Sequence, residues 1–406
     1  MTDPSTETEY MFNPLAPGFT DDPYPAYQEL RETDPVHDHP FGVWFVATYE
    51  EVTALLRADL SVNARLVTNG MFREQFDLLD HGGMNKLSLS MLDRDPPDHT
   101  RLRSLVTKVF TPRSVSALEP EIAAWVDAAL DEIGKAGRAD LVETLAFPLP
   151  FAVISQMLGI PTADHAKIRS LSGLVVRSLE VVMDEEMLRA INRAGEELTE
   201  TIRDLITWKR AHPGADLLTA LIDAEHEGDR LTDDELIAQV GLLYIAGHET
   251  TVNLIGGGVL ALLRHRDQYE LLRSRPDLAA NAVEELLRFE SPVQQTRRVT
   301  TVPHTVRDRE IPAGSFVVAC LASANRDEAF WGPDAGELRL DRPNARQHVS
   351  FGAGPHHCLG AALARLEGRV ALERLARRFP GLELDGDVEW NGRINLRGPA
   401  KLPIKV

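Results

Sequence analysis

A long apolar helix is the feature that most constrains how this 406-residue chain can fold. Thr232 and Glu235 form a predicted capping box, in which the Thr hydroxyl and the Glu carboxylate satisfy backbone donors at the helix start. The apolar pattern then continues to about Leu263. Roughly thirty residues at about 1.5 Å each span about 45 Å, which is the width of a whole domain. Because residues 240–246 are apolar on most faces, we expect this helix to cross the protein interior.

The rest of the sequence predicts more helix than strand. Helical spacing of apolar residues predicts further helices, and aromatic or β-branched runs predict strands. The expected helices are 25–33, 50–57 and several between 100 and 207, and the expected strands are 42–48, 299–308, 311–322 and parts of the tail from 382. Residues 58–92 lack a regular pattern, which leaves a functional loop or a disordered surface insert as alternatives. We predict a mainly α fold with a smaller β portion, in a single domain over residues 1–406.

Charge and cysteine content argue against several classes of protein. The chain has 43 Lys and Arg against 62 Asp and Glu, and a net charge of −19 disfavours non-specific nucleic-acid binding. Its two cysteines, Cys320 and Cys358, are too few for a disulfide scaffold and indicate a reducing compartment. Residues 1–10 lack the pattern of a signal peptide, and no run reaches the roughly 18 apolar residues of a membrane helix. We therefore expect a cytoplasmic protein with no membrane or nucleic-acid partner.

The segment Phe351 to Gly360, FGAGPHHCLG, carries the strongest chemical signal. Its glycines allow the backbone to approach a flat or bulky group, and Cys358 comes just before a strongly helical segment. We expect the helix dipole to favour the thiolate, which is a strong ligand for soft or borderline metals. The alternatives are a buried structural cysteine, a zinc site with His356 and His357, and a nucleophile with a histidine base.

This segment resembles the haem-binding loop of the cytochrome P450 family, Phe-Gly-x-Gly-x-(His/Arg)-x-Cys-x-Gly, at every fixed position. The resemblance implies haem b as the cofactor and Cys358 as the axial ligand of its iron. It also implies that His356 meets a haem propionate and that Phe351 packs near the sulfur. Gly352 and Gly360 belong to the same cofactor-binding loop.

A second motif, Glu285-Leu286-Leu287-Arg288, places an acid and a base three residues apart on one helix face. Such a pair is common in helices and carries little information alone. About seventy residues before the cysteine loop, it resembles the structural Glu-x-x-Arg pair of the cytochrome P450 family. The resemblance implies that a later arginine completes the pair, and Arg342 is the candidate.

A third motif, Ala246-Gly247-His248-Glu249-Thr250-Thr251, puts polar groups inside the long apolar helix. One interpretation is a threonine that bonds back to the helix and bends it. In the cytochrome P450 family, a similar pattern faces the haem iron. The resemblance then implies that Ala246 and Gly247 leave room for dioxygen and substrate, and that Glu249 and Thr250 relay protons.

Cationic residues form the fourth group. His99 and Arg103 lie four residues apart and share a helix face, which suits an anionic group. The resemblance makes both of them haem-propionate ligands, together with Arg298. Arg297 is the substitute if the register differs by one, and solvated surface cations are the alternative for all of them.

The resemblance covers nearly the whole chain and implies a cytochrome P450 fold with the long helix over the haem. It implies a monooxygenase that hydroxylates or epoxidises a hydrophobic small molecule with dioxygen. Electrons would come from a separate ferredoxin or flavodoxin with its reductase, and we expect a monomer. A haem-binding sensor or carrier and a peroxide-dependent peroxygenase are the rival functions. The presence of both Glu249 and Thr250 argues against the two rivals.

The substrate is narrowed only to a hydrophobic molecule such as a steroid, terpenoid, fatty acid or polyketide. The predicted pocket residues are Leu242, Leu243, Ala246, Val293, Gln294 and Ile394. Docking of an acidic electron donor near Cys358 implies a locally basic surface. The candidates for that surface are Arg101, Lys108, Arg113, Arg365 and Arg369.

Overall fold

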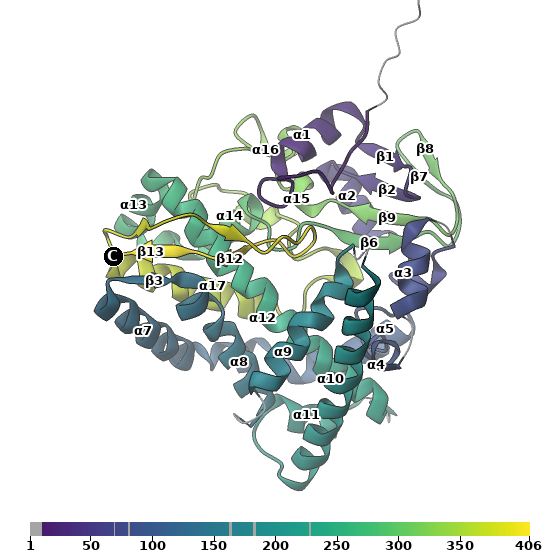
Figure 1. The fold of residues 1–406 in the computed structure, drawn as a ribbon, viewed down its shortest axis with the longest axis horizontal. Coiled ribbons are helices and arrows are strands. Elements are labelled where there is room, and N and C mark those ends of the chain that lie inside the picture. Colours follow the sequence, from purple (N-terminus) through teal and green to yellow (C-terminus); the bar gives the residue numbers. More distant parts are fainter. Residues whose placement is uncertain (1–9, 69, 80–81, 162–164, 182–183, 227–228) are drawn as a thin grey trace, which may run out of the picture.

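The structure is a computed structural model that describes residues 10–68, 70–79, 82–161, 165–181, 184–226 and 229–406. Helices make up most of it, and a four-stranded sheet with its covering helices lies to one side (Figure 1). None of the helices in these ranges has both the length and the apolar character that crossing a membrane requires.

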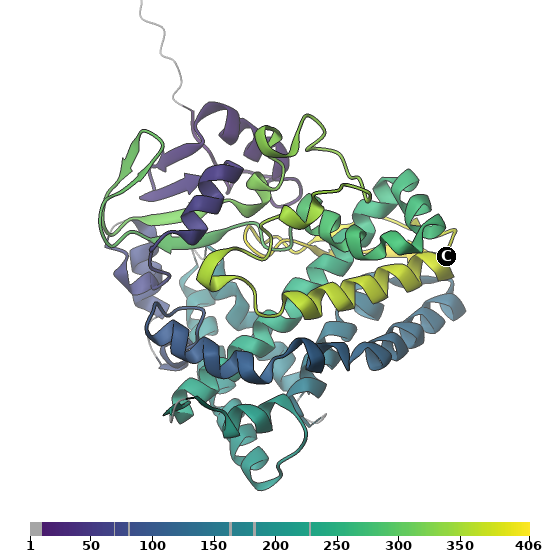
Figure 2. The same ribbon diagram turned by 180° about the vertical axis from the view of Figure 1, so that it is seen from behind.

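The predicted long helix is α12 (Asp233–Arg264), and both hydrogen bonds of its capping box are present. Residues 236–241 and 251–262 of this helix are buried, because α8 (Pro148–Leu158), α10 (Glu185–Ala211) and α17 (Ala361–Arg378) pack around it. Seen from behind, α17 lies beside α7 (Glu119–Ala136), and the loop that precedes α17 enters the centre of the molecule (Figure 2). The principal hydrophobic core therefore surrounds α12.

The four-stranded sheet has the order β1 (Val36–His39), β2 (Val43–Val46), β9 (Phe316–Ala319) and β6 (Thr296–Val299). Strands β2 and β9 run parallel, and the two outer pairs are antiparallel. The pairing of β6 with β9 holds residues 296–299 at the sheet edge that faces the helical part (Figure 1).

The remaining elements complete both parts of the fold. The other helices are α1 (Tyr24–Thr33), α2 (Tyr49–Arg57), α5 (Asp98–Val109), α6 (Pro112–Ser116), α9 (His165–Val175), α11 (Leu217–Asp223), α13 (Arg266–Ser274), α14 (Ala279–Phe289), α15 (Leu321–Ala324) and α16 (Glu328–Trp331). The other strands are β3 (Arg138–Asp140), β4 (Glu225–His226), β5 (Asp229–Arg230), β7 (His304–Val306), β8 (Arg309–Ile311), β10 (Glu383–Leu384), β11 (Glu389–Trp390), β12 (Pro399–Lys401) and β13 (Pro403–Lys405).

Two local predictions were wrong. The segment 58–92 is not a plain loop, because it contains α3 (Met71–Leu79) and α4 (Gly82–Leu87). Its glycines mark helix starts: Gly70 and Gly82 have φ of +83° and +54°, a region that favours glycine. Strands were expected over 299–308 and 311–322. The structure instead has four shorter strands, β6 to β9, within residues 296–319, because tight connections interrupt this β-rich segment.

Candidate functional site

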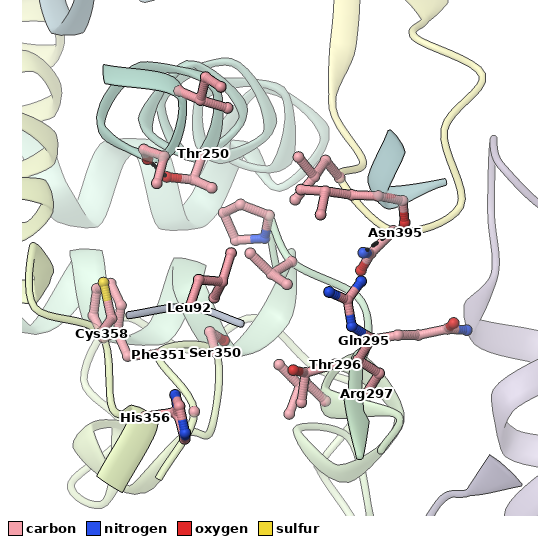
Figure 3. Close-up of a pocket in the computed structure, with 18 of the residues that line it drawn as sticks. Leu92, Thr250, Gln295, Thr296, Arg297, Ser350, Phe351, His356, Cys358 and Asn395 are labelled. Atoms are coloured by element: carbon pink, nitrogen blue, oxygen red, sulfur yellow. Dashed lines mark hydrogen bonds between the residues drawn. The ribbon is translucent and has the colours of Figure 1, made fainter. Parts of the chain in front are cut away.

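A cavity of about 440 Å³ lies between α12, the cysteine loop, β6 and the tail loop 394–396. This volume is within the range of small-molecule sites. Most of its wall is apolar side chains from α12 and from the segments around it. Cys358 and Thr250 lie on the same side of this space, from the cysteine loop and α12, while Arg297 and Asn395 lie on the other (Figure 3).

Cys358 lines the cavity, and the local backbone explains how the loop presents it. The N–H of Cys358 donates to the carbonyl of Phe351 at 2.9 Å, which closes the loop. Gly354 has a φ of +69°, and a Cβ there would lie 2.6 Å from the carbonyl oxygen of Leu56, so only glycine fits. Gly352 and Gly360, from the same loop, also line the cavity.

Two opposing effects set the pKa of Cys358, and the expected contribution of the helix start is one of them. Burial raises the pKa of Cys358, although the backbone N–H groups of Gly360 and Ala361 and the nearby Arg103 and Arg365 act against it. The helix start therefore stabilises the thiolate less than burial destabilises it. A metal ion bound to the sulfur would offset this cost and favour the thiolate.

The α12 wall carries small residues and one hydroxyl. Ala246, Gly247 and Thr250 all line the cavity. A Cβ at Gly247 would lie 3.2 Å from the side chain of Ile154, so a larger residue would disturb the packing of α8. The hydroxyl of Thr250 donates to the carbonyl oxygen of Ala246 at 3.0 Å. The back-bond considered from the sequence is thus present, and it leaves the hydroxyl oxygen at the cavity surface.

Glu249 does not line the cavity, because it lies on the face of α12 next to the one that carries Thr250. Its Oε2 accepts from Nη1 of Arg393 at 2.9 Å, and Nε2 of the buried His248 lies 3.6 Å from its Oε1. Burial alone would raise the pKa of Glu249, but His248 and Arg393 together hold it below its ordinary value. Sequence analysis gave no role to His248 and overlooked Arg393, because nothing in the sequence connects residue 393 to α12.

Two histidines and two arginines gather on the wall next to the cysteine loop. The rings of His99 and His356 lie 4.0 Å apart, and Arg298 and Arg103 are close enough to act on the pKa of His356. Burial, reinforced by His99, Arg298 and Arg103, lowers the pKa of His356 to about 3. Burial also lowers the pKa of Arg298 to about 10.

These four side chains fit an anionic group. Among the described residues, no carboxylate hydrogen-bonds to any of them, and Nε2 of His99 has no partner. Arg298 is a buried cation, and the two histidines can donate hydrogen bonds as neutral rings, so a bound anion would satisfy these groups. Together with the thiol and the glycine-rich loop, this cluster fits a haem with its two propionates. Arg297 is not part of it, since it pairs with Asp93.

The Glu285, Arg288 and Arg342 side chains form one buried cluster. Nε and Nη2 of Arg288 each donate to an oxygen of Glu285 at 2.7 Å, and Nε of Arg342 donates to Glu285 at 3.2 Å. The remaining donors of Arg288 reach the carbonyl oxygens of Asn325, Ala335 and Glu337. The cluster therefore joins α14 to the segment that leads to the cysteine loop.

Five of the six predicted pocket residues line the cavity. Leu242, Leu243, Ala246, Val293 and Ile394 line the cavity. Gln294 does not, and its inclusion was wrong. Its amide donates to the carbonyl of Ser291 at 2.7 Å and its side chain is fully buried behind the wall. Successive residues of an extended chain point to opposite faces, so the neighbours of Gln294 line the cavity instead.

Sequence analysis overlooked the contact that closes the tail loop onto the cavity. The carboxylate of Glu180 accepts from three consecutive backbone N–H groups, those of Ile394, Asn395 and Leu396, at 2.9, 2.9 and 3.0 Å. Glu180 itself lines the cavity, just after the helical segment that ends at Leu179. One carboxylate thus clamps two cavity walls together.

The candidates for a basic docking surface differ in their ion pairs. Arg101 is bound by Asp229 and Glu235, so it belongs to the start of α12 rather than to an open face. Arg365 pairs with Glu284 at 2.9 Å, and Arg369 pairs with Glu119 at 2.6 Å. These pairs reduce the positive charge available to a partner. Lys108 and Arg113 lie at the end of α5 and in α6.

Comparison with known proteins agrees with this geometry. The family model for Cytochrome P450 matches residues 30–391. The cytochrome P450 monooxygenase PikC of Streptomyces venezuelae is 41% identical over 96% of this chain and 92% of its own length. The vitamin D(3) 25-hydroxylase of Pseudonocardia autotrophica is 39% identical over 100% of this chain and 98% of its own. The solved structure of PksS, the cytochrome P450 of the bacillaene polyketide synthase of Bacillus subtilis 168, has a TM-score of 0.87 at 36% identity and covers 97% of this chain and 99% of that one.

Proposed function

Since the chain belongs to the cytochrome P450 family and is a monooxygenase of that family, we propose that it holds haem b through Cys358 and oxidises a hydrophobic small molecule. Electrons come from a separate ferredoxin or flavodoxin. The observation that carries the proposal is a cysteine in the wall of a largely apolar cavity, with a hydroxyl of α12 on the same cavity surface. When bound, haem with a thiolate ligand supplies the activation of dioxygen.

The residues around the cavity have separate roles in binding the haem. Cys358 holds the iron, and His99, Arg103, Arg298 and His356 hold the propionates. The last four are cations or hydrogen-bond donors that have no carboxylate partner among the described residues. Phe351 lines the cavity beside the sulfur and lies under the guanidinium of Arg365, 4.6 Å from its ring centre.

Proton delivery falls to Thr250 and Glu249. The hydroxyl of Thr250 is oriented by its bond to Ala246, which leaves its oxygen able to accept a hydrogen bond from a proton donor in the cavity and so to hold that donor in place. Glu249 lies behind the cavity wall and is partly exposed, so it takes up protons from solvent and passes them towards Thr250. Arg393 and His248 keep its carboxylate ionised until then.

The substrate is a hydrophobic molecule held against Leu242, Leu243, Val293 and Ile394. The apolar wall supports this class, and so do the names of relatives, which refer to a polyketide synthase and to vitamin D(3). Burial of apolar substrate surface excludes water from the site and supplies binding energy of about 25 cal/mol per Å².

Two measurements test the proposal. The reduced carbon-monoxide complex of the wild type is expected to show the long-wavelength Soret band of thiolate-ligated haem, and Cys358→His is expected to show the band of histidine-ligated haem. Cys320→Ser is the matched control, because Cys320 is fully buried away from the cavity and is expected to leave the band unchanged. A wild-type band in Cys358→His contradicts the ligand assignment. Product formation with dioxygen, ferredoxin and reductase, compared with peroxide alone, separates a monooxygenase from a peroxygenase.

A further inference from the structure

A side chamber of about 150 Å³ borders the main cavity at the end that carries Arg297. Phe76, Leu92 and Arg297 line both spaces, so they form the boundary. The side chamber alone is lined by the polar residues Asn63, Arg65, Ser88, Ser90 and Asp93. The side chamber is otherwise lined by apolar side chains, so these residues and Arg297 supply polar groups at the end of the site away from Cys358 (Figure 3).

Arg297 is the residue at this boundary with unused hydrogen-bonding capacity. Its Nη2 donates to Oδ1 of Asp93 at 2.5 Å, and its guanidinium carbon lies 5.7 Å from the ring centre of Phe76. A guanidinium has five N–H donors, and within the described residues only Asp93 accepts from this one. The side chain is only 24% exposed, so the other donors need acceptors inside the cavities.

Asp93 is the acidic group that contacts Arg297. Burial raises the pKa of Asp93, and the guanidinium of Arg297 is the foremost of the charges that act against that rise. Among the described residues, Glu180 is the other acid that lines these spaces, and its oxygens already accept three backbone N–H groups of the tail loop. A carboxylate from a ligand would therefore accept from the donors of Arg297 that Asp93 leaves unused.

We propose that Arg297 is a specificity-determining residue that binds the carboxylate of an amphipathic acid, whose apolar body extends through the main cavity towards Cys358. The proposal rests on the proposed function, because it concerns the substrate of that same site. A guanidinium and a carboxylate match in a two-bond geometry, which an alcohol of the same shape does not reproduce. Asp93 holds the guanidinium at the boundary of the two spaces.

The experiment uses the haem-loaded protein and two matched ligand pairs. One pair is a long-chain saturated carboxylate and the primary alcohol of the same length, and the other is a polycyclic carboxylate and its alcohol. Binding is measured by titration of the haem spectral shift and by calorimetry. The wild type is expected to bind at least one acid about tenfold more tightly than its alcohol, as loss of a hydrogen bond to a charged group predicts.

Three variants make the result specific. Arg297→Gln is expected to lose the tenfold preference while binding the alcohol as the wild type does. Asp93→Asn keeps an oxygen that can accept from Arg297 and so hold its guanidinium, but removes the competing charge. This variant is expected to keep or increase the preference, and loss of the preference contradicts the proposal. Arg309→Gln is the control for the change in net charge, because Arg309, on β8, is half exposed and pairs with Asp34 at the end of α1. It is expected to behave as the wild type.

The remaining outcomes overturn the proposal. Equal binding of acids and alcohols by the wild type, or a preference that survives in Arg297→Gln, removes the role of Arg297. Absence of binding by all four ligands, with a normal thiolate Soret band, rejects the amphipathic acid as the substrate class but leaves the proposed function intact. Absence of that band rejects the proposed function itself.

Discussion

Replacement of Arg288 by lysine tests the interpretation of the buried cluster of Glu285, Arg288 and Arg342. Arg288 is fully buried, and all five of its N–H donors are used: two reach Glu285, and three reach backbone carbonyls at 2.7 to 2.9 Å. Lysine keeps the positive charge but has three donors on a single nitrogen, which cannot reach five acceptors arranged in a plane.

The expected loss follows from this count. At least two buried carbonyl oxygens lose a charged donor, and each such loss costs about 1–3 kcal/mol. We therefore expect Arg288→Lys to lower the free energy of unfolding by about 3 kcal/mol, against a total stability of roughly 5–15 kcal/mol for typical domains. Arg288→Ala would also leave the carboxylate of Glu285 buried with only Arg342 as a cationic partner, and is expected to prevent folding.

The assay is urea unfolding of the haem-loaded protein, followed by circular dichroism and by the Soret band. The shift of the midpoint, multiplied by the slope, gives the change in free energy. The control is Arg378→Lys, because Arg378 pairs with Asp131 at 2.8 Å with both side chains 56% exposed. Exposed pairs contribute about 0–1 kcal/mol, so the control is expected to stay near the wild type. If Arg288→Lys is as stable as the control, the buried donors do not stabilise the fold as argued.

Three further predictions concern catalysis. Thr250→Ala is expected to consume reductant at a similar rate but to release hydrogen peroxide in place of product. Thr250→Ser keeps the hydroxyl and is expected to form as much product per reductant consumed as the wild type. Equal amounts of peroxide from the two variants contradict the role of Thr250 in proton delivery. In Glu180→Gln, one amide oxygen replaces the carboxylate that accepts three N–H groups of the tail loop. Substrate association and dissociation are therefore expected to become about tenfold faster in stopped-flow measurements. Unchanged rates would show that the contact between Glu180 and the tail loop does not limit substrate entry. Arg113→Glu is expected to slow the first reduction by an acidic ferredoxin at low salt. The difference in rate from the wild type should shrink at about 0.1 M salt, where the Debye length is roughly 10 Å. A reduction rate that changes neither with salt nor with the substitution excludes Arg113 from the docking surface.

Local sequence signals predicted the parts of the fold that depend on local interactions. The capping box of α12 involves residues three apart, and the apolar pattern of the helix repeats over its whole length, so its start and its end were predicted within about one residue. By contrast, α3 and α4 are short helices between glycines, and a few apolar positions in each gave too weak a periodicity. Their stability comes from contact with α10, which lies more than a hundred residues later in the chain.

Register errors explain the misplaced pocket residue. Residues after Pro292 are extended, so a shift of one position exchanges the cavity face for the buried face. Sequence analysis chose Gln294, whose side chain is buried against Ser291, and so missed Gln295 and Arg297 in the wall. Residues 295–298 all line the cavity without alternating, so no simple period in the sequence identifies them.

The tail loop shows why contacts distant in sequence change the interpretation of the motif in α12. Glu249 and Thr250 are neighbours, but a helix turns about 100° per residue, so only Thr250 lines the cavity while Glu249 faces Arg393. Arg393 is adjacent to Ile394, a cavity residue whose N–H is held by Glu180. One loop therefore contacts the acid, the substrate wall and the clamp. A substitution in this loop acts on the ionisation of Glu249 as well as on substrate binding, and the two effects separate only when the pH profile and the affinity are measured on the same variant.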